Sequence, residues 1–304
     1  MHAAYNVALI GAGGIARAHR QAANASEGVV KVTAAVDVRE DAPAAGLLPV
    51  YPTLESLLAS EHKPDAIVLC TPPSVRAEVI EPALAAGLGV LTEKPVARSH
   101  AEAEALLKIV EEHDAGDRCF VGYCHRFTPA IVEMRRRLLA GDLGTPIRFE
   151  NTFACWHPGM QTGWMSDPAT SGGGSFLDTG CHSIDLFRFV TGEHEAGSRV
   201  IGSRLHFEWD GRGDSNATVL LGGSGGIAGV LQSGWQEPER FVVSVVGSKG
   251  LLSYDYMQPE TLRFQPSAEE FGPAEDLWIE THDVRFVRQL EAFARRCQGE
   301  SPLA

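Results

Sequence analysis

The stretch Val7-Ala8-Leu9-Ile10-Gly11-Ala12-Gly13-Gly14-Ile15-Ala16 decides the fold of the first part of the chain. An apolar run that fits a buried strand leads into a glycine-rich turn, and a helical run follows up to Ala25. In a dinucleotide-binding turn the first glycine permits the bend, the second lets backbone approach a pyrophosphate, and a small third residue lets helix pack on strand. The helix N-terminus then faces the phosphates. The expected cofactor contacts in this turn are Gly11, Gly13, Gly14, Ile15 and Ala16.

A second predicted strand, 30–36, ends at Asp37. An acidic residue about twenty positions past the glycines is where the 2′-hydroxyl of the adenine ribose is held. The carboxylate would repel the 2′-phosphate of NADP, so Asp37 favours NAD. Arg39 is open to two interpretations, because it would either accompany a 2′-phosphate or remain a solvated surface charge. The sequence therefore predicts NAD as cofactor and does not exclude NADP.

Strands and helices alternate through roughly the first 120 residues, which predicts a parallel sheet with right-handed crossovers. Ligands of such sheets lie beyond the carboxyl ends of the strands. Thr71, Pro72, Glu93 and Lys94 follow two of these strands and are counted as cofactor contacts, and Tyr123 follows a third. The helices predicted after the first are 53–59, 75–86 and 99–112 (capped by Ser99), and the strands are 65–70, 89–92 and 118–123.

The second half of the chain has a different pattern. Strand-like runs with partial alternation are separated by glycine-rich turns, which predicts an α+β domain with an open, largely antiparallel sheet. The predicted domains are 1–124 and 125–304, and the terminal helix at about 282–298 is a candidate to pack back on the first domain. The predicted strands are 147–153, 199–209, 216–221, 226–235, 240–246 and 251–254, and the helices are 129–140, 180–190 and 282–296.

Composition excludes several classes of protein. Lys and Arg total 26 against 39 Asp and Glu, and the resulting net charge of −13 disfavours nucleic acid as a partner. No apolar run reaches membrane-spanning length, and the N-terminus enters the first strand without room for a signal peptide. The six cysteines form no C-x-x-C and no disulfide-like framework, so a reducing cytoplasm is predicted.

A second stretch carries the expected chemistry: Gly172-Gly173-Gly174-Ser175-Phe176-Leu177-Asp178-Thr179-Gly180-Cys181-His182. Alone, a histidine on a helix is commonly a satisfied core residue, and a lysine before proline is commonly a surface charge. Together with the glycine turn, Lys94 and the Asp178-x-x-x-His182 pair are the parts of a nicotinamide-dependent dehydrogenase. No cysteine or histidine pair here has structural-zinc spacing, so no metal is predicted.

The order of GAGGIA (11–16), EKP (93–95), GYCHRFTPA (122–130), GGGSFLDTGCHSIDL (172–186) and VVGSKGLL (245–252) resembles the Gfo/Idh/MocA oxidoreductase family over nearly the whole chain. The resemblance implies a Rossmann domain followed by an α/β domain whose open sheet often forms an oligomer interface, giving a homodimer or homotetramer. It also implies oxidation or reduction of one hydroxyl of a sugar, inositol or related polyol with NAD(P).

By this resemblance Lys94 contacts the nicotinamide ribose and the reacting hydroxyl, His182 is the general base, and Asp178 binds a substrate hydroxyl and orients the histidine. Elementary chemistry agrees, because hydride removal from an alcohol requires loss of the hydroxyl proton and an ammonium stabilises the developing alkoxide. The further substrate-binding candidates, from a strand end and from a Gly/Pro-rich loop, are Tyr123, His157 and Trp164.

The chain departs from the family pattern at two places. Arg76 stands where a histidine often follows the T-P-x motif, which puts its cofactor-side contact in doubt, and the chain stops at Ala304 where relatives usually add another helix. Two other functions stay open: a cofactor-binding sensor without turnover, and an NAD-assisted glycosidase. Few basic residues are expected to line the pocket apart from Lys94, Arg126 and Arg76, which favours a neutral polyol over a phosphorylated one.

Overall fold

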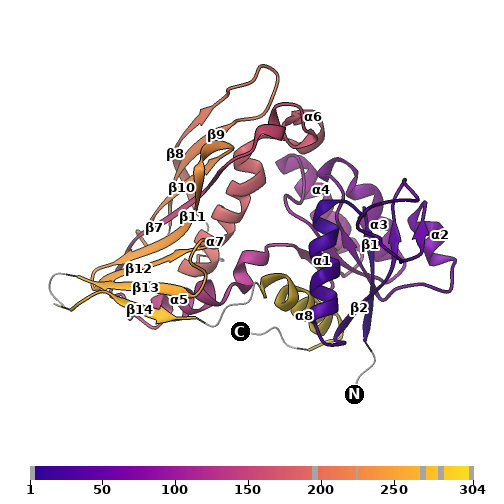
Figure 1. Cartoon of the computed structure of the whole chain (residues 1–304), viewed down its shortest axis with the longest axis horizontal. Helices are drawn as coiled ribbons and strands as arrows, with labels where there is room; N and C mark the ends of the chain where they lie inside the picture. The colour runs from indigo at the N-terminus through magenta and orange to yellow at the C-terminus, as the bar shows by residue number, and fades with distance from the viewer. Residues whose placement is uncertain (1–3, 194–197, 224, 268–271, 280–283, 301–304) are drawn as a thin grey trace. The chain divides into compact units, whose positions relative to one another are not determined.

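The structure is a computed structural model that describes residues 4–193, 198–223, 225–267, 272–279 and 284–300. The chain forms two units. One comprises Met1–Cys124 together with Val284–Ala304, and the other comprises His125–Asp283. The last helix of the chain, α8 (Arg285–Cys297), therefore belongs to the first unit (Figure 1).

Six parallel strands form the sheet of the first unit in the order β3-β2-β1-β4-β5-β6. The order reverses between β1 and β4, which is the switch point where doubly wound sheets bind ligands. The predicted Rossmann fold is confirmed. The strands are β1 (Tyr5–Ile10), β2 (Val30–Val36), β3 (Val50–Tyr51), β4 (Ala66–Leu69), β5 (Gly89–Thr92) and β6 (Cys119–Val121).

Helices cover both faces of this sheet, and the strands are apolar on both sides for that reason. Val7 and Leu9 of β1 pack in a cluster with residues of α1 and α8, whereas Ala8 and Ile10 pack in a second cluster with residues of α3 and α4. The Ser99 hydroxyl accepts from Glu102 N–H at 3.2 Å and caps α4, as predicted. The other helices are α1 (Gly14–Ala25), α2 (Leu54–Leu58), α3 (Ala77–Ala85), α4 (His100–Glu112) and the 3₁₀ turn η1 (Pro73–Val75).

The terminal helix α8 completes the core of the first unit. The Phe293 ring makes edge contacts with Tyr5 at 6.3 Å and with Phe120 at 5.6 Å between ring centroids. Arg296 forms an ion pair with Asp117, just ahead of β6. Residues 282–283 of the predicted terminal helix lie outside the described residues, and the observed helix begins at Arg285.

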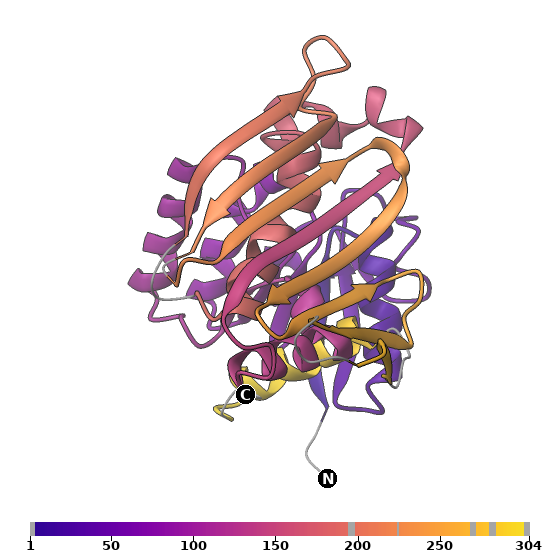
Figure 2. The ribbon, with the colours of Figure 1, turned by 90° about the vertical axis from the view of Figure 1, so that its left-hand side faces the viewer.

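The second unit is built on an eight-stranded sheet in the order β14-β13-β12-β11-β7-β10-β9-β8, shown face-on in Figure 2. Its neighbouring strands are antiparallel except β7 and β10, which run parallel. The predicted open, largely antiparallel sheet is confirmed. The strands are β7 (Pro146–Trp156), β8 (Arg199–His206), β9 (Asn216–Gly222), β10 (Ala228–Gly234), β11 (Gln236–Gly247), β12 (Gly250–Asp255), β13 (Thr261–Pro266) and β14 (Glu275–Trp278).

The core of this unit lies between one face of the sheet and two helices, α5 (Pro129–Leu139) and α7 (Cys181–Thr191) (Figure 1). Phe149 of β7 packs edge-on against Phe187 of α7 at 5.7 Å. Side chains alternate along a strand, so Arg148 and Glu150 of β7 lie on the opposite face, where they form an ion pair at 2.7 Å. The short helical segments are η2 (Cys124–Phe127), η3 (Pro158–Gln161), η4 (Trp164–Ser166), α6 (Pro168–Ser171) and the π-helix η5 (Phe176–Gly180).

Within the described ranges, no helix combines the length and the apolar character that a membrane crossing requires.

Candidate active site

The two glycines that begin the predicted dinucleotide turn meet different constraints. Gly11 has φ of +83°, and a Cβ there would lie 3.0 Å from Thr71 Cγ2, so the turn and the approach of β4 both require glycine. A Cβ at Gly13 meets no atom of the described residues within 4 Å, and the same holds at Gly14. Protein packing therefore does not explain these glycines. Backbone approach by a phosphate at the N-terminus of α1 does, so the turn fits a dinucleotide.

Asp37, at the end of β2, is joined to the glycine turn. Its Oδ2 accepts the N–H of Ala12 at 2.8 Å, and its Oδ1 accepts from Arg39 Nε at 3.1 Å. Burial acts to raise the pKa of Asp37, but the hydrogen bonds from Arg39 and from the Ala12 N–H hold that pKa below its ordinary value. The carboxylate is thus ionised at neutral pH and stands where a ribose diol is recognised. The Arg39 side chain is about half exposed and forms an ion pair with the Asp37 carboxylate.

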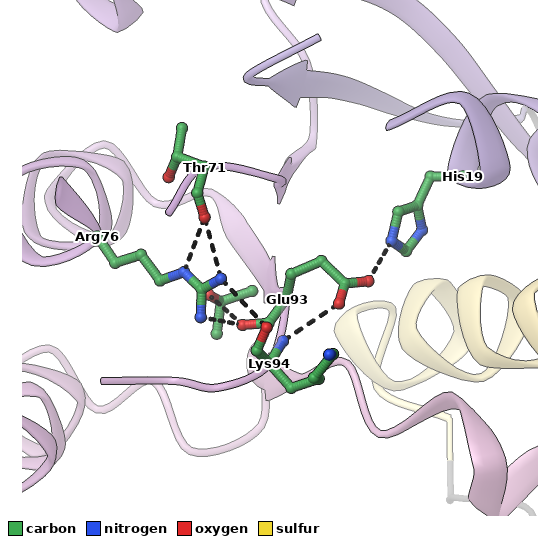
Figure 3. A network of polar contacts seen from close by, with 6 residues as sticks. His19, Thr71, Arg76, Glu93 and Lys94 are labelled. Atoms are coloured by element: carbon green, nitrogen blue, oxygen red, sulfur yellow. Dashed lines mark hydrogen bonds and ion pairs between the residues drawn. The ribbon is translucent and has the colours of Figure 1, made fainter. Parts of the chain in front are cut away.

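The carboxyl ends of β4 and β5, the two strands that follow β1 in the sheet order, also carry predicted residues (Figure 3). Thr71 and Pro72 follow β4, and the Thr71 carbonyl accepts from Arg76 Nη2 at 3.0 Å. Glu93 and Lys94 follow β5, and the Lys94 N–H donates to Glu93 Oε2 at 3.2 Å. The sequence left the role of position 76 in doubt, and the structure directs the Arg76 guanidinium at backbone carbonyls of these loops.

Tyr123 follows β6, one strand further along the same edge of the sheet. It is partly buried, and its N–H donates to Val121 O at 2.8 Å. Its neighbour Gly122 approaches Glu93 closely, because a Cβ at Gly122 would lie 3.3 Å from Glu93 Oε1. The structure thus gathers the strand ends of the first unit along one edge.

In the second unit Gly174, the last of the three consecutive glycines, is required by tight packing of backbone on backbone. A Cβ at Gly174 would lie 2.1 Å from the carbonyl oxygen of Asp214, and a Cβ at Gly213 would lie 2.4 Å from the backbone of Gly173. The Asp214 carboxylate then accepts from Ser175 Oγ and from the Phe176 N–H, both at 2.8 Å. The segment before β9 therefore fixes where the π-helix begins.

Asp178 lies in this π-helix, a rare geometry that is frequent at functional sites. Its Oδ2 accepts from the Trp235 indole N–H at 3.4 Å, and Trp235 is fully buried at the end of β10. Trp235 also accepts, through its carbonyl, the N–H of His157 at 2.9 Å. His157 and Trp164, the other predicted substrate residue of this unit, are both exposed in the segment between β7 and α6.

His182 is the second residue of α7 and is buried, with 6% of its surface exposed. Its ring packs edge-on against His125, with 4.5 Å between ring centroids. His125 Nδ1 in turn lies 2.8 Å from the hydroxyl of Tyr256, just past β12. Sequence reasoning did not single out His125, Tyr256 or Trp235, because they are distant in sequence from His182 and Asp178 and belong to no catalytic spacing.

Among the residues that the structure describes, no three or more His, Cys, Asp or Glu side chains are grouped so as to hold a metal ion. What the two units offer is instead a dinucleotide cradle with a lysine loop in one and a carboxylate with a buried histidine in the other. Together the fold and these groups define an oxidoreductase that binds a nicotinamide dinucleotide on a Rossmann domain.

The chain belongs to the Gfo/Idh/MocA oxidoreductase family. The family model described as "Oxidoreductase family, NAD-binding Rossmann fold" matches residues 5–123, and the model described as "GFO/IDH/MocA C-terminal domain" matches residues 131–253. The resemblance seen in the sequence motifs is thereby confirmed.

Characterised relatives match over most of the chain. Inositol 2-dehydrogenase of Rhizobium meliloti (strain 1021) is 25% identical over 96% of this chain and 86% of its own. D-xylose 1-dehydrogenase (NADP(+)) 2 of Haloferax volcanii is 29% identical over 93% of this chain and 83% of its own. The fold matches a solved inositol dehydrogenase homolog complexed with NAD+ from Azotobacter vinelandii, with a TM-score of 0.83 and 20% identity over 97% of this chain and 87% of that one.

Proposed function

We propose that this protein is an NAD-dependent dehydrogenase that transfers a hydride between the cofactor and a hydroxyl-bearing carbon of a sugar, inositol or related polyol. Two similar proteins, an inositol 2-dehydrogenase and a D-xylose 1-dehydrogenase, support the substrate class. The observation that carries the proposal is the buried His182 on the turn after Asp178, because a dinucleotide-binding protein without turnover has no chemical need for it.

Three side chains of this chain would perform the proton chemistry. His182 takes the proton of the reacting hydroxyl in oxidation and returns it in reduction, since imidazole is the side chain suited to proton transfer near neutral pH. The Lys94 ammonium stabilises the alkoxide that develops as the proton leaves. Asp178 accepts a neighbouring substrate hydroxyl and orients His182. The nicotinamide, when bound, supplies the hydride acceptor or donor.

The cofactor contacts proposed for the first unit extend from the glycine turn to the lysine loop. Gly11, Gly13, Gly14, Ile15 and Ala16 would face the pyrophosphate, and Asp37 would accept the ribose hydroxyls. An ionised Asp37 that already holds Arg39 supports NAD over NADP. Thr71, Pro72, Glu93 and Lys94 would complete the nicotinamide end.

The substrate is proposed to be uncharged. Two of the basic residues expected near the pocket are occupied within their own units: Arg76 donates to backbone carbonyls, and Arg126 Nε donates to Asp185 Oδ2 at 2.8 Å. A phosphorylated sugar needs cations that are available to it. Tyr123, His157 and Trp164 are the proposed substrate contacts, and their polar tips and indole ring suit a polyol.

The proposed assembly is a homodimer or homotetramer formed through the open face of the second unit's sheet, in the cytoplasm. Large apolar side chains on that face support it: Trp156, Ile201 and Leu220 are 63%, 61% and 43% exposed. None of the six cysteines forms a disulfide, which suits a reducing compartment. Leu220→Glu should lower the mass measured by light scattering if this face is the interface.

The deciding experiment measures NADH formation across a panel of cyclitols, aldoses and deoxysugars, with NAD and NADP in parallel. Wild-type protein is compared with Lys94→Ala and His182→Ala, and His100→Ala, at an exposed histidine that begins α4, serves as control. Turnover of a polyol that both variants lose by about 1,000-fold and the control retains would support the proposal.

Other outcomes would contradict it. Binding of NAD without turnover of any compound in the panel would favour a sensor. Cleavage of a glycoside without net NADH would favour an NAD-assisted glycosidase. A sugar phosphate that turns over faster than its parent sugar would contradict the neutral substrate.

A further inference from the structure

A buried guanidinium holds the backbone on both sides of Lys94 (Figure 3). Arg76, at the start of α3, is 2% exposed. Its Nη2 donates to the Thr71 carbonyl at 3.0 Å and to the Lys94 carbonyl at 3.4 Å, and its Nη1 donates to the carbonyls of Glu93 and Pro95. A planar fork with five N–H donors can serve several acceptors at once, which an ammonium group cannot do with the same fixed geometry.

A second contact holds the same loop from the opposite side. The Glu93 side chain, 5% exposed, accepts the Lys94 N–H through Oε2 and lies 2.7 Å from His19 Nε2 through Oε1. His19 is fully buried on α1, the helix that begins at the glycine turn, and its ring packs edge-on against Phe286 of α8 at 5.3 Å. The lysine loop is thus joined to the helix that would face the cofactor phosphates.

We propose that Arg76, Glu93 and His19 are positioning residues that set the place of Lys94 relative to the cofactor cradle. The inference rests on the proposed catalytic role of Lys94. Arg76 fixes the carbonyl side of the loop, and Glu93 with His19 fixes its N–H side, so the backbone from which the Lys94 side chain extends has little freedom. Arg76 and His19 are not among the proposed substrate or cofactor contacts, and the side chain of Glu93, whose position is among the proposed cofactor contacts, acts here by holding the Lys94 N–H.

The expected consequence is a loss of rate with little loss of binding. Displacement of a catalytic group by about 1 Å costs on the order of 100-fold in rate. Removing the guanidinium of Arg76 should therefore lower kcat by roughly 10- to 100-fold, while the Kd for NADH stays within about 3-fold of the wild-type value. A purely structural role would instead lower the unfolding temperature and affect binding and rate alike.

The kinetic test is a double-mutant cycle between positions 76 and 94. Arg76→Met keeps the length of the side chain and removes its donors, and Arg98→Met, at an ion-paired arginine before α4, is the matched control. If Arg76 acts through Lys94, the Arg76→Met/Lys94→Ala protein is no slower than Lys94→Ala alone, within about 2-fold. Losses that multiply would overturn the inference.

A second readout uses the protein without cofactor or substrate. Hydrogen exchange of the backbone amides over 93–97 should become at least 10-fold faster in Arg76→Met and in Glu93→Gln, whereas exchange in β1 and in α1 outside His19 should stay as in the wild type. Unchanged exchange over 93–97 overturns the inference. Arg76→Lys, which retains the charge, replaces Arg76→Met if the latter does not fold.

The two readouts separate this inference from the proposed function. Full activity of Lys94→Ala would contradict the proposed role of Lys94, whatever the exchange data show. Loss of activity in Lys94→Ala with normal exchange in Arg76→Met would leave the dehydrogenase proposal intact and reject the positioning role of Arg76.

Discussion

The two units build their halves of the chemistry in different ways. In the first unit the predicted residues follow consecutive strand ends and are held by short backbone contacts, such as the Ala12 N–H to Asp37 and the Lys94 N–H to Glu93. In the second unit Asp178 is held by Trp235, 57 positions away, and the partner of His125 is 131 positions away. Cofactor binding is thus encoded in contiguous motifs, whereas the substrate side depends on tertiary packing.

The largest effect is expected where that packing is tightest. Gly174→Ala would place a Cβ 2.1 Å from Asp214 O, so the segments must separate, at a cost of about 3 kcal/mol in the free energy of unfolding. Thermal unfolding and kcat should both fall. Gly202→Ala in β8, where a Cβ meets no described atom within 4 Å, is the control. An unfolding temperature like that of the wild type would contradict the prediction.

Gly13→Ala should show the opposite behaviour in the first unit. The unfolding temperature should be retained, because a Cβ there meets no described atom within 4 Å, while NADH affinity falls by about 100-fold, or about 2.7 kcal/mol. Fluorescence titration with NADH measures the affinity. Gly116→Ala, at an equally open position between α4 and β6, should bind normally. If Gly13→Ala binds NADH as tightly as the wild type, the prediction is wrong, and the glycines of the two units do not differ in the way proposed.

The choice between NAD and NADP should depend on the ion pair between Asp37 and Arg39. Asp37→Ser removes a charge-assisted hydrogen bond of about 1.5–3 kcal/mol, so the Kd for NAD should rise roughly 10- to 100-fold. Release of Arg39 should raise the affinity for NADP at the same time. The ratio of kcat/KM for the two cofactors measures both changes. The prediction is wrong if Asp37→Ser/Arg39→Ala gains as much NADP activity as Asp37→Ser.

A smaller effect is expected at Tyr256, which contacts His125, the residue whose ring packs against His182. Tyr256→Phe removes the 2.8 Å contact to His125 Nδ1 but retains a ring that can pack on His125, so kcat should fall about 5-fold, equivalent to about 1 kcal/mol. The Kd for NADH should not change. Tyr51→Phe, which removes a similar tyrosine–histidine contact to His62 in the first unit, should leave kcat unchanged. Equal effects from both variants would count against a role for Tyr256 in the site.

The smallest effect concerns an ion pair outside either site. The Arg136 guanidinium, with help from Arg137, lowers the pKa of Glu133 to about 2. Because this folded-state pKa lies below the ordinary value of about 4.3, the stabilisation is present above pH ~4 and is lost as pH falls toward 2. Glu133→Gln should cost roughly 0.5–1 kcal/mol at pH ~7, the range expected for a solvent-screened pair. Urea unfolding of the wild type and of Glu133→Gln at pH ~7 and at pH ~2 checks this prediction. A cost of the substitution that is the same at both pH values contradicts it.

Local pattern was sufficient for most of the fold. The predicted strands 30–36 and 89–92 coincide with β2 and β5, and the helix predicted over 129–140 ends one residue later than α5. The strands β3, β13 and β14 were not predicted, because β3 and β14 have only two and four residues and because β13 and the edge strand β14 carry charged side chains. The parallel pairing of β7 and β10 was also missed, since pairing partners are not encoded in the period of either strand.

The candidate site divides in the same way. The glycine turn, Asp37 and the Glu93-Lys94 loop were all recognisable from spacing. The contacts of Trp235, Tyr256 and His125 could not be predicted, because they join segments whose proximity is decided by the sheet register. The π-helical turn at Asp178 is equally invisible in sequence, since glycine and phenylalanine around it fit several backbone geometries.

The placement of α8 has a consequence for how the chain acquires its structure during synthesis. The chain leaves the first unit after Cys124 and returns to it at Val284, so the helix that covers Tyr5 and Phe120 leaves the ribosome only after the entire second unit. Until then the part of the apolar sheet face that α8 covers stays exposed, although α1 already packs on the same face. The cofactor domain is begun first and finished last, which makes this face a natural client for a chaperone during translation.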